Sequence, residues 1–369
     1  MLRFLTAGES HGPCLTVIVD GLPAGLAVDE GAINRDLARR QGGYGRGGRM
    51  RIERDVAEVL GGVIAGRTTG APVALRIENR DWPNWREHWA AGDLPRLSVP
   101  RPGHADYAGM VKYGLDDARP ILERASARET AARVVAGALA KLLLAAFGIE
   151  VGSYVTEIGG ITSQTPDLSP TELWRLAEES AVRCPDPAAS GRMQEAIDAA
   201  RAAGDSLGGV FVVEALGVPV GLGSHAQWDR RLDARLAAAV MSIPAVKGVE
   251  IGPAFENARL PGTQVHDRLY PDGRGGVLRR TNRAGGVEGG MSNGAPLVVR
   301  AAMKPIPTTL TPLASVDLST GQAASTQYQR SDVCAVPAAA VVGEAMVAWC
   351  LAEALVEKRG GDSLAEMRR

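Results

Sequence analysis

The sequence predicts an α+β fold in which helices and strands form mixed layers. Apolar residues recur at helical spacing in some segments and form short continuous runs, typical of buried strands, in others. The two kinds of segment do not alternate strictly, as they would in a doubly wound parallel sheet. With 45% apolar and 22% charged residues, the chain has the composition of a globular protein with a sizeable core. No repeat or low-complexity linker divides it, so a single domain over residues 1–369 is expected.

Strands are expected first at residues 15–20, where an apolar run ends at the turn formed by Gly21, Leu22 and Pro23. Four later runs are rich in β-branched residues and have the length of strands. They cover residues 151–158, 210–215, 246–251 and 297–302.

The clearest helices begin at capping residues. Asp29 precedes a segment with apolar residues at helical spacing, and its carboxylate can accept from a free amide of the first turn. Ser126 and Ser169 are each followed three residues later by Glu, which is the capping-box pattern. A long helix over 336–358 is expected to begin at Pro337 and to stop before Gly360, and shorter helices are expected around 193–197 and 232–236.

Charge and cysteine content exclude several classes of function. The 41 Lys and Arg nearly balance 42 Asp and Glu, which argues against a partner that is a nucleic acid or a membrane surface. Four cysteines lie far apart with no C-x-x-C pair, so neither a zinc site nor a disulfide framework is expected. Glu9 and His11 come before any apolar run, so no signal peptide is expected. Residues 134–149 are too short to span a membrane and contain Lys141, and a cytoplasmic protein is predicted.

Basic charge is concentrated in one glycine-rich segment. Residues 35–54 contain seven arginines and two acidic residues, a local charge of +5 in a chain whose net charge is −1. Guanidinium groups on such a loop suit bidentate binding of phosphate or carboxylate. A solvated basic surface is an equal alternative on composition alone. RNA binding is a third alternative, although Tyr44 is the only aromatic residue there on which a base could stack.

Two histidines lie in similar loops. His11 stands within Gly8-Glu9-Ser10-His11-Gly12-Pro13, and His104 within 100–106, three residues after Arg101. A histidine in a loop is a candidate proton donor near neutral pH. The spacing of the five histidines gives no metal signature such as H-E-x-x-H, so no metal is expected. Arg124, Ser126 and Arg128 surround a helix start, where free amides favour an anion, although a helix cap needs no ligand.

Seven motifs, in order along the chain, resemble the chorismate synthase family. They are GESHGP (8–13), GYGRGGRMRIERD (43–55), RPGHAD (101–106), RASARETAAR (124–133), AVKGVEIG (245–252), AGGVEGGMSNG (284–294) and RSDVCAVPA (330–338). Each motif alone is weak evidence, but the set extends over nearly the whole chain.

The resemblance implies a β-α-β sandwich fold and a homotetramer. It implies a lyase that converts 5-enolpyruvylshikimate 3-phosphate to chorismate and phosphate by a redox-neutral anti-1,4-elimination, the last common step to the aromatic amino acids. It also implies reduced FMN as cofactor, NADP as a further ligand, and an external flavin reductase or another source of reduced flavin. An arginine cluster in a neutral chain agrees with a substrate that has two carboxylates and a phosphate.

Site residues follow from the same resemblance. His11 would be the acid toward the departing phosphate, His104 would protonate or hydrogen-bond the reduced flavin, and Asp332 would help the flavin to accept the substrate's proton. Arg46, Arg49, Arg101 and Arg128 would hold the substrate's anionic groups, while Arg40 and Arg46 match NADP positions, so two roles compete for Arg46. The FMN contacts would be Arg124, Ala125, Ser126, Pro244, Ala245, Gly289, Lys304, Pro305, Ile306, Pro307, Thr308 and Arg330.

Two other functions remain open on the sequence. A flavin oxidoreductase that consumes NADPH would share the cofactor but release no phosphate. An RNA-binding protein that uses the arginine and glycine segment would lose affinity steeply as salt is added.

Overall fold

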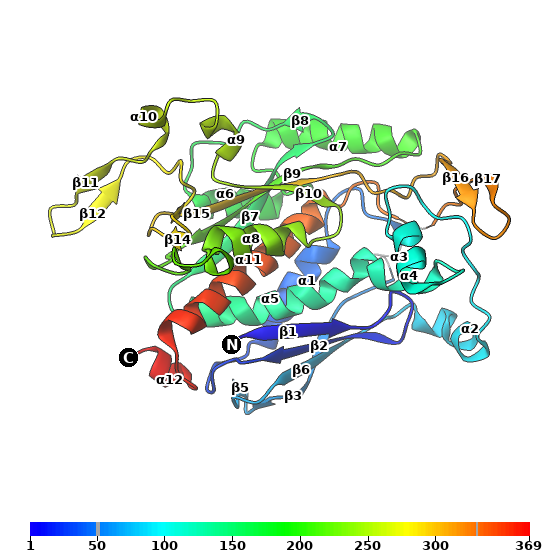
Figure 1. Ribbon diagram of the computed structural model, residues 1–369, viewed down its shortest axis with the longest axis horizontal. Coiled ribbons are helices and arrows are strands. Elements are labelled where there is room, and N and C mark those ends of the chain that lie inside the picture. Colours follow the sequence, from blue (N-terminus) through cyan, green and yellow to red (C-terminus); the bar gives the residue numbers. More distant parts are fainter. Residues whose placement is uncertain (49–51, 330) are drawn as a thin grey trace.

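The chain folds into two antiparallel sheets with a layer of helices between them (Figure 1). The computed structural model describes residues 1–48, 52–329 and 331–369. Helices α5 (Thr130–Ala145) and α11 (Val336–Arg359) pack closely together in the middle layer, with α1 (Glu30–Gln41) beside them. The predicted α+β class and the β-α-β sandwich implied by the resemblance are therefore confirmed.

The first sheet consists of four strands in the order β1-β2-β6-β3. Its inner side chains alternate with outer ones, so Leu15, Val17 and Val19 of β2 are buried while Ile18 is exposed. The strands are β1 (Arg3–Ala7), β2 (Cys14–Asp20), β3 (Ala57–Gly61) and β6 (Val73–Glu78). Helix α5 covers the inner face, and β2 contributes most of that contact.

The second sheet has five strands in the order β10-β15-β9-β7-β8, all antiparallel. They are β7 (Glu150–Ile158), β8 (Ile161–Thr162), β9 (Gly209–Leu216), β10 (Val246–Ile251) and β15 (Leu297–Met303). Helix α11 packs on β7 and β9, and α8 (Leu232–Met241) packs on β10. On the outer face, α6 (Pro170–Glu179) places Trp174 against Gly152 of β7, where a Cβ would lie only 2.2 Å from the indole.

The contact between α5 and α11 depends on a glycine. A Cβ at Gly137 would lie 2.3 Å from the Cβ of Ala345, so a larger residue would push the two helices apart. Over most of its length helix α11 is apolar on all sides because neighbours surround it, and Glu344, which is 0% exposed, is its one buried charged residue. Its 24 residues are long and apolar enough to cross a membrane, but 89% of its most apolar stretch is buried inside the protein, as in a core helix.

Glu344 is held by cations from three elements. It pairs with Arg39 of α1 at 2.7 Å, with Lys141 of α5 at 2.6 Å and with Arg183 at 3.3 Å, and it accepts from Ser153 of β7. Burial works to raise the pKa of Glu344, but these cations outweigh it and hold the pKa far below its ordinary range. The carboxylate is therefore ionised and ties four elements together.

Short elements complete the structure. They are β4 (Val63–Ile64), β5 (Arg67–Thr68), α2 (Arg86–Ala91), α3 (Asp106–Tyr113), α4 (Arg119–Ala125), α7 (Pro187–Ala202), α9 (Ala254–Asn257), α10 (Gly262–Val265), β11 (Leu269–Pro271), β12 (Val277–Arg279), β13 (Val287–Glu288), β14 (Met291–Ser292), β16 (Ala314–Asp317), β17 (Gln322–Ser325) and α12 (Leu364–Met367), with the 3-10 turns η2 (Trp82–Asn84), η3 (Ala127–Glu129) and η4 (Trp228–Arg230).

All five predicted strands and the predicted helices exist, with one local correction. Ser126 was expected to form a capping box with Glu129, but it caps the 3-10 turn η3, where its Oγ accepts from the amide of Arg128 at 3.3 Å. Glu129 points elsewhere and pairs with Arg133 at 3.0 Å. An ion pair to the next helical turn thus replaces the capping-box bond that the pattern suggested.

Candidate active site

The loop after β1 holds His11 against α4. The amide of His11 donates to Oε2 of Glu123 at 2.8 Å, and its Nδ1 lies 2.9 Å from Oε1 of the same carboxylate. The ring lies against Trp85, which follows η2, with 4.3 Å between the ring centroids and an angle of 45° between the ring planes. A second anchor is Arg124, which donates to the carbonyl oxygens of Thr6 and Gly8 and so ties α4 to the same loop. The sequence motif around His11 is therefore held by a helix more than a hundred residues away.

Glu123 is buried, with 3% of its surface exposed. Burial works to raise the pKa of this carboxyl, but the hydrogen bonds and charge of His11 outweigh it, and the pKa lies below its ordinary value. Arg119, one turn earlier on α4, lies 3.4 Å from Oε1 and 5.7 Å from the Trp85 ring. His11 thus faces an ionised carboxylate.

His104 is held by a second buried carboxylate. Its Nδ1 lies 2.5 Å from Oδ1 of Asp106, the first residue of α3, which is 2% exposed. Arg101 donates to both oxygens of Asp106, at 2.8 and 3.0 Å, and to Thr308 at 3.1 Å. Burial opposes ionisation of Asp106, yet the bonds from His104 and Arg101 hold its pKa well below the ordinary range. Asp106 therefore divides its charge between a histidine and an arginine.

Arg128 and Arg40 converge on one acidic residue, Asp55. Arg128 donates to Asp55 at 2.5 Å and to Asn79 at 2.9 Å, while Arg40 lies 3.6 Å from the other Asp55 oxygen and donates to Thr130 at 2.9 Å. Burial lowers the pKa of Arg40 to about 9, against the attraction of Asp55. Both arginines are buried, at 3% and 4% exposure, so their charges are already partly compensated inside the protein.

Arg46 and Asp332 form a further pair beside this group. Nη1 of Arg46 lies 2.6 Å from Oδ2 of Asp332, and the amide of Gly47 donates to Oδ1 at 2.6 Å. The charges of Arg46, Arg128 and Asp332 all influence Arg40, which places the four groups in one neighbourhood. The arginine-rich loop thus meets the segment that leads into α11.

The predicted flavin segment lies beside the His104 loop. Lys304 donates through Nζ to the carbonyl oxygen of Gly103 at 2.6 Å, and Ser331 donates to the carbonyl oxygen of Thr308 at 2.8 Å. The carbonyl oxygen of Ala245, whose φ is +68°, accepts from the amide of Lys304. Pro244, Pro305, Ile306 and Pro307 are neighbours of these residues along the chain, as Ala125 and Ser126 are of Arg124.

One described residue of the prediction, Gly289, is not brought into this group. Gly289 lies in the turn between β13 and β14, next to the end of β15 that begins at Leu297, whereas Lys304 follows the other end. A seven-residue strand is about 20 Å long, so Gly289 and Lys304 lie roughly that far apart. Arg49 and Arg330 lie outside the described residues.

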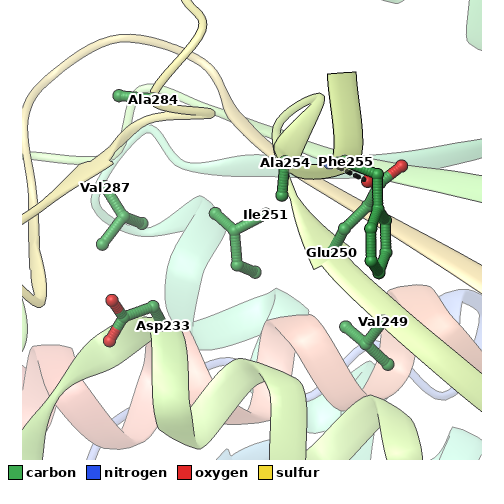
Figure 2. Close-up of a pocket in the computed structure, with 8 residues that line it drawn as sticks. All are labelled: Asp233, Val249, Glu250, Ile251, Ala254, Phe255, Ala284 and Val287. Carbon is green, nitrogen blue, oxygen red and sulfur yellow. Dashed lines mark hydrogen bonds between the residues drawn. The ribbon is translucent and has the colours of Figure 1, made fainter. Parts of the chain in front are cut away.

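The hollow in Figure 2 is separate from the histidines. It has a volume of about 350 Å³ and lies between α8, β10 and the segment before β13. Two carboxylates line it, Asp233 and Glu250, and Glu250 accepts from the amide of Phe255 at 3.1 Å. Both carboxylates are paired with arginines, Asp233 with Arg231 at 2.6 Å and Glu250 with Arg300 at 2.7 Å, and none of the predicted site residues lines this hollow.

Sequence reasoning missed the residues that orient the predicted ones. Asp106 could have been found, because it follows His104 by two residues and stands in the same motif. Glu123, Asp55 and Asn79 gave no such signal, since each meets its partner only through folding. Asn79 also donates to the carbonyl oxygens of Glu9 and Gly12, so it joins the His11 loop to Arg128.

Comparison with known proteins places the same residues in a family. A sequence model of chorismate synthase matches residues 2–356. Over 100% of its length the chain is 58% identical to chorismate synthase of Desulforudis audaxviator, covering 95% of that protein, and 55% identical to that of Chlorobaculum tepidum, covering 96%. A crystal structure of chorismate synthase superposes with a TM-score of 0.81 at 46% identity, over 100% of this chain and 95% of the other.

Proposed function

This chain belongs to the chorismate synthase family, and from that membership we propose how its residues divide the work of the reaction. The reaction converts 5-enolpyruvylshikimate 3-phosphate to chorismate and phosphate in the shikimate pathway, and the family uses reduced FMN for it. The observation that supports the assignment is the pairing of each loop histidine with a buried carboxylate, beside a group of arginines.

His11 is the proton donor for the departing phosphate. Its Nδ1 is engaged by Glu123, so Nε2 is the nitrogen that can hold a proton toward the substrate. Arg128 and Arg46 bind the substrate's anionic groups from the neighbouring elements. Their partners Asp55 and Asp332 compensate the arginine charges before substrate arrives, which limits the cost of holding several cations together.

The residues present fit a bound FMN at the His104 loop. Lys304, Arg101 and Thr308 offer a donor set suited to a flavin with its phosphate, and they lie together beside His104. When bound, reduced FMN supplies electron density to the substrate without net oxidation. His104 holds a proton against the flavin and is oriented by Asp106, while Asp332 helps to move the proton that leaves the substrate.

NADP binding is supported least by the geometry. The resemblance implies Arg40 and Arg46, but Arg40 is 3% exposed and donates inward to Thr130 and to the carbonyl oxygen of Ala127. We therefore propose Arg46 as a residue that binds the substrate, and a separate flavin reductase or another external source of reduced FMN. We also propose a cytoplasmic location, because a source of reduced FMN is available in that compartment.

A homotetramer is proposed from two features. The outer face of the first sheet exposes Leu5, paired across the strands with Ile18, at 72% and 42% exposure. Contiguous apolar surface of this kind is typical of subunit contacts. Gly289 would reach a flavin at the His104 loop only from another copy of the chain, which agrees with the same assembly.

An anaerobic assay tests the proposal. The protein is mixed with 5-enolpyruvylshikimate 3-phosphate and chemically reduced FMN, without NADPH, and chorismate and phosphate are followed together. Equal release of both products is expected. Activity only with NADPH and oxidised FMN would show that the protein reduces its own flavin, and NADPH consumption without phosphate release would favour a flavin oxidoreductase.

A further inference from the structure

We propose that Glu123 is the positioning residue for His11: its buried carboxylate fixes the proton on Nδ1 and aims Nε2 at the substrate. This inference rests on the proposed role of His11 as the acid. Neither the sequence motifs nor the family resemblance assigned any part to Glu123.

The contacts of His11 fix its backbone and the direction of its ring. One carboxylate takes both the amide and Nδ1 of His11, at 2.8 and 2.9 Å, which fixes the backbone and the ring against the same group. Trp85 lies against the ring at 4.3 Å and limits its rotation. Within the part of the chain that the structure describes, no partner reaches Nε2. The ring therefore has one nitrogen committed to the protein and one available to a ligand.

Few charged groups lie near the His11 ring in the described part of the chain. The groups around the ring are Glu123 and Arg119 of α4 and the uncharged Trp85, with Glu9 two residues earlier on the same loop. Arg119 touches only one carboxylate oxygen, at 3.4 Å, which is long for a hydrogen bond. Glu123 therefore makes its three short contacts, at 2.8, 2.9 and 3.1 Å, with His11 and only this long one with Arg119.

His104 provides the contrast within the same chain. Its carboxylate, Asp106, also receives three bonds from Arg101, and Arg101 lies 3.1 Å from Nδ1 of His104. A variant at Asp106 would release both an arginine and a histidine. Glu123 is the position at which the effect of a carboxylate on one histidine can be measured separately.

The proton balance of the step is complete. As the bond between carbon 3 and the phosphate oxygen breaks, Nε2–H of the imidazolium gives its proton to that oxygen. The ring becomes neutral and keeps its Nδ1 proton in the bond to Glu123. Water returns a proton to Nε2 between turnovers, and His11 is neither oxidised nor reduced.

A double-mutant cycle tests the inference with the full chain, reduced FMN and 5-enolpyruvylshikimate 3-phosphate. The variants are Glu123→Gln, His11→Ala and the double variant. We expect Glu123→Gln to lower kcat about tenfold to a hundredfold, part of what a general acid contributes, with little change in KM. In the His11→Ala background, Glu123→Gln should cause no further loss.

Two other variants separate position from structure. Glu129→Gln removes a half-buried carboxylate on the next turn, which pairs with Arg133 and touches no histidine, and it should leave kcat unchanged. Glu123→Asp keeps a carboxylate that can accept from Nδ1 and should restore part of the kcat lost in Glu123→Gln, which also covers the case in which Glu123→Gln folds poorly.

Each contrary result has one meaning. If Glu123→Gln lowers kcat equally with and without His11, or changes KM alone, Glu123 is structural and the inference is wrong while the acid role of His11 stands. If His11→Ala keeps full activity, the acid role itself is wrong and the inference falls with it.

Discussion

At the scale of single residues, the site is a set of opposite charges compensated in pairs. Asp332 accepts from Arg46 and from the amide of Gly47, both at 2.6 Å, so it fixes the arginine loop against the start of α11. Buried or half-buried pairs of this kind cost free energy of desolvation, and one partner alone is worse than both. Their presence around two histidines agrees with a site built to receive a multiply charged anion.

Asp332→Asn should separate charge from shape at this position. The amide is nearly isosteric, so the fold should persist, but the variant cannot help to move the substrate's proton or compensate the charge of Arg46. We expect kcat to fall about a hundredfold or more, measured in the anaerobic assay with circular dichroism as the folding control. Full retained activity would refute the proposed role of Asp332.

At the scale of elements, the closeness of α5 and α11 decides how the helical layer fits between the sheets. Gly137 faces Ala345 where the two helices touch. Protein interiors are packed so densely that even one added methyl group changes the stability of the fold. The site loops at the ends of these helices thus depend on a contact that has no chemical role.

Gly137→Ala should therefore destabilise the protein, although alanine favours helices. Overpacking of a tight contact typically costs about 1–3 kcal/mol. Gly191, in the exposed face of α7, is the matched control because a Cβ there meets nothing within 4 Å. Gly191→Ala should be neutral or stabilise by roughly 0.5–1 kcal/mol. Urea unfolding of both variants measures the difference, and equal effects would show that the helices can separate at little cost.

At the scale of the whole molecule, a buried ion cluster joins the layers. Glu344 links α1, α5, α11 and β7 through Arg39, Lys141 and Ser153. Because its folded pKa lies below its unfolded value of 4.5, its ionisation stabilises the fold above that pH, and this stability is lost as the pH falls below it.

Glu344→Gln should lower the free energy of unfolding by about 3–5 kcal/mol near pH 7, since three cations lose their buried partner. As the pH falls below about 4.5, the variant should also lose less stability than the parent protein, because it lacks the Glu344 carboxyl group that titrates there. Urea unfolding at a series of pH values measures both effects. A parallel pH dependence in the two proteins would contradict the assignment.

Assembly is the second property of the whole molecule. Leu5→Glu places a charge in the exposed apolar row of the first sheet and should shift the protein from the proposed tetramer toward smaller species in analytical ultracentrifugation. Leu168→Glu, at a position 42% exposed before α6, serves as the control and should leave the assembly unchanged. An unaltered tetramer in Leu5→Glu would show that this face is not a subunit contact.

The sequence by itself determined the elements whose signals are local. The capping residue Asp29 marks the start of α1, and Pro337 and Gly360 mark the ends of α11, because caps and backbone restrictions act within one or two turns. It also determined the family and the two loop histidines, since these are read as continuous motifs. It did not identify β1, β3 or β6, whose half-exposed strands alternate too briefly to be distinguished from loops.

Only the tertiary structure decided what surrounds those histidines. Glu123 lies 112 positions from His11, and Asp55 lies 73 from Arg128, so no local pattern links the partners. Such pairs form because a charge removed from water needs an opposite charge within a few ångströms, whichever part of the chain supplies it. The fold brings α4 against the loop after β1, and that contact turns a histidine in a motif into one with a defined proton and direction.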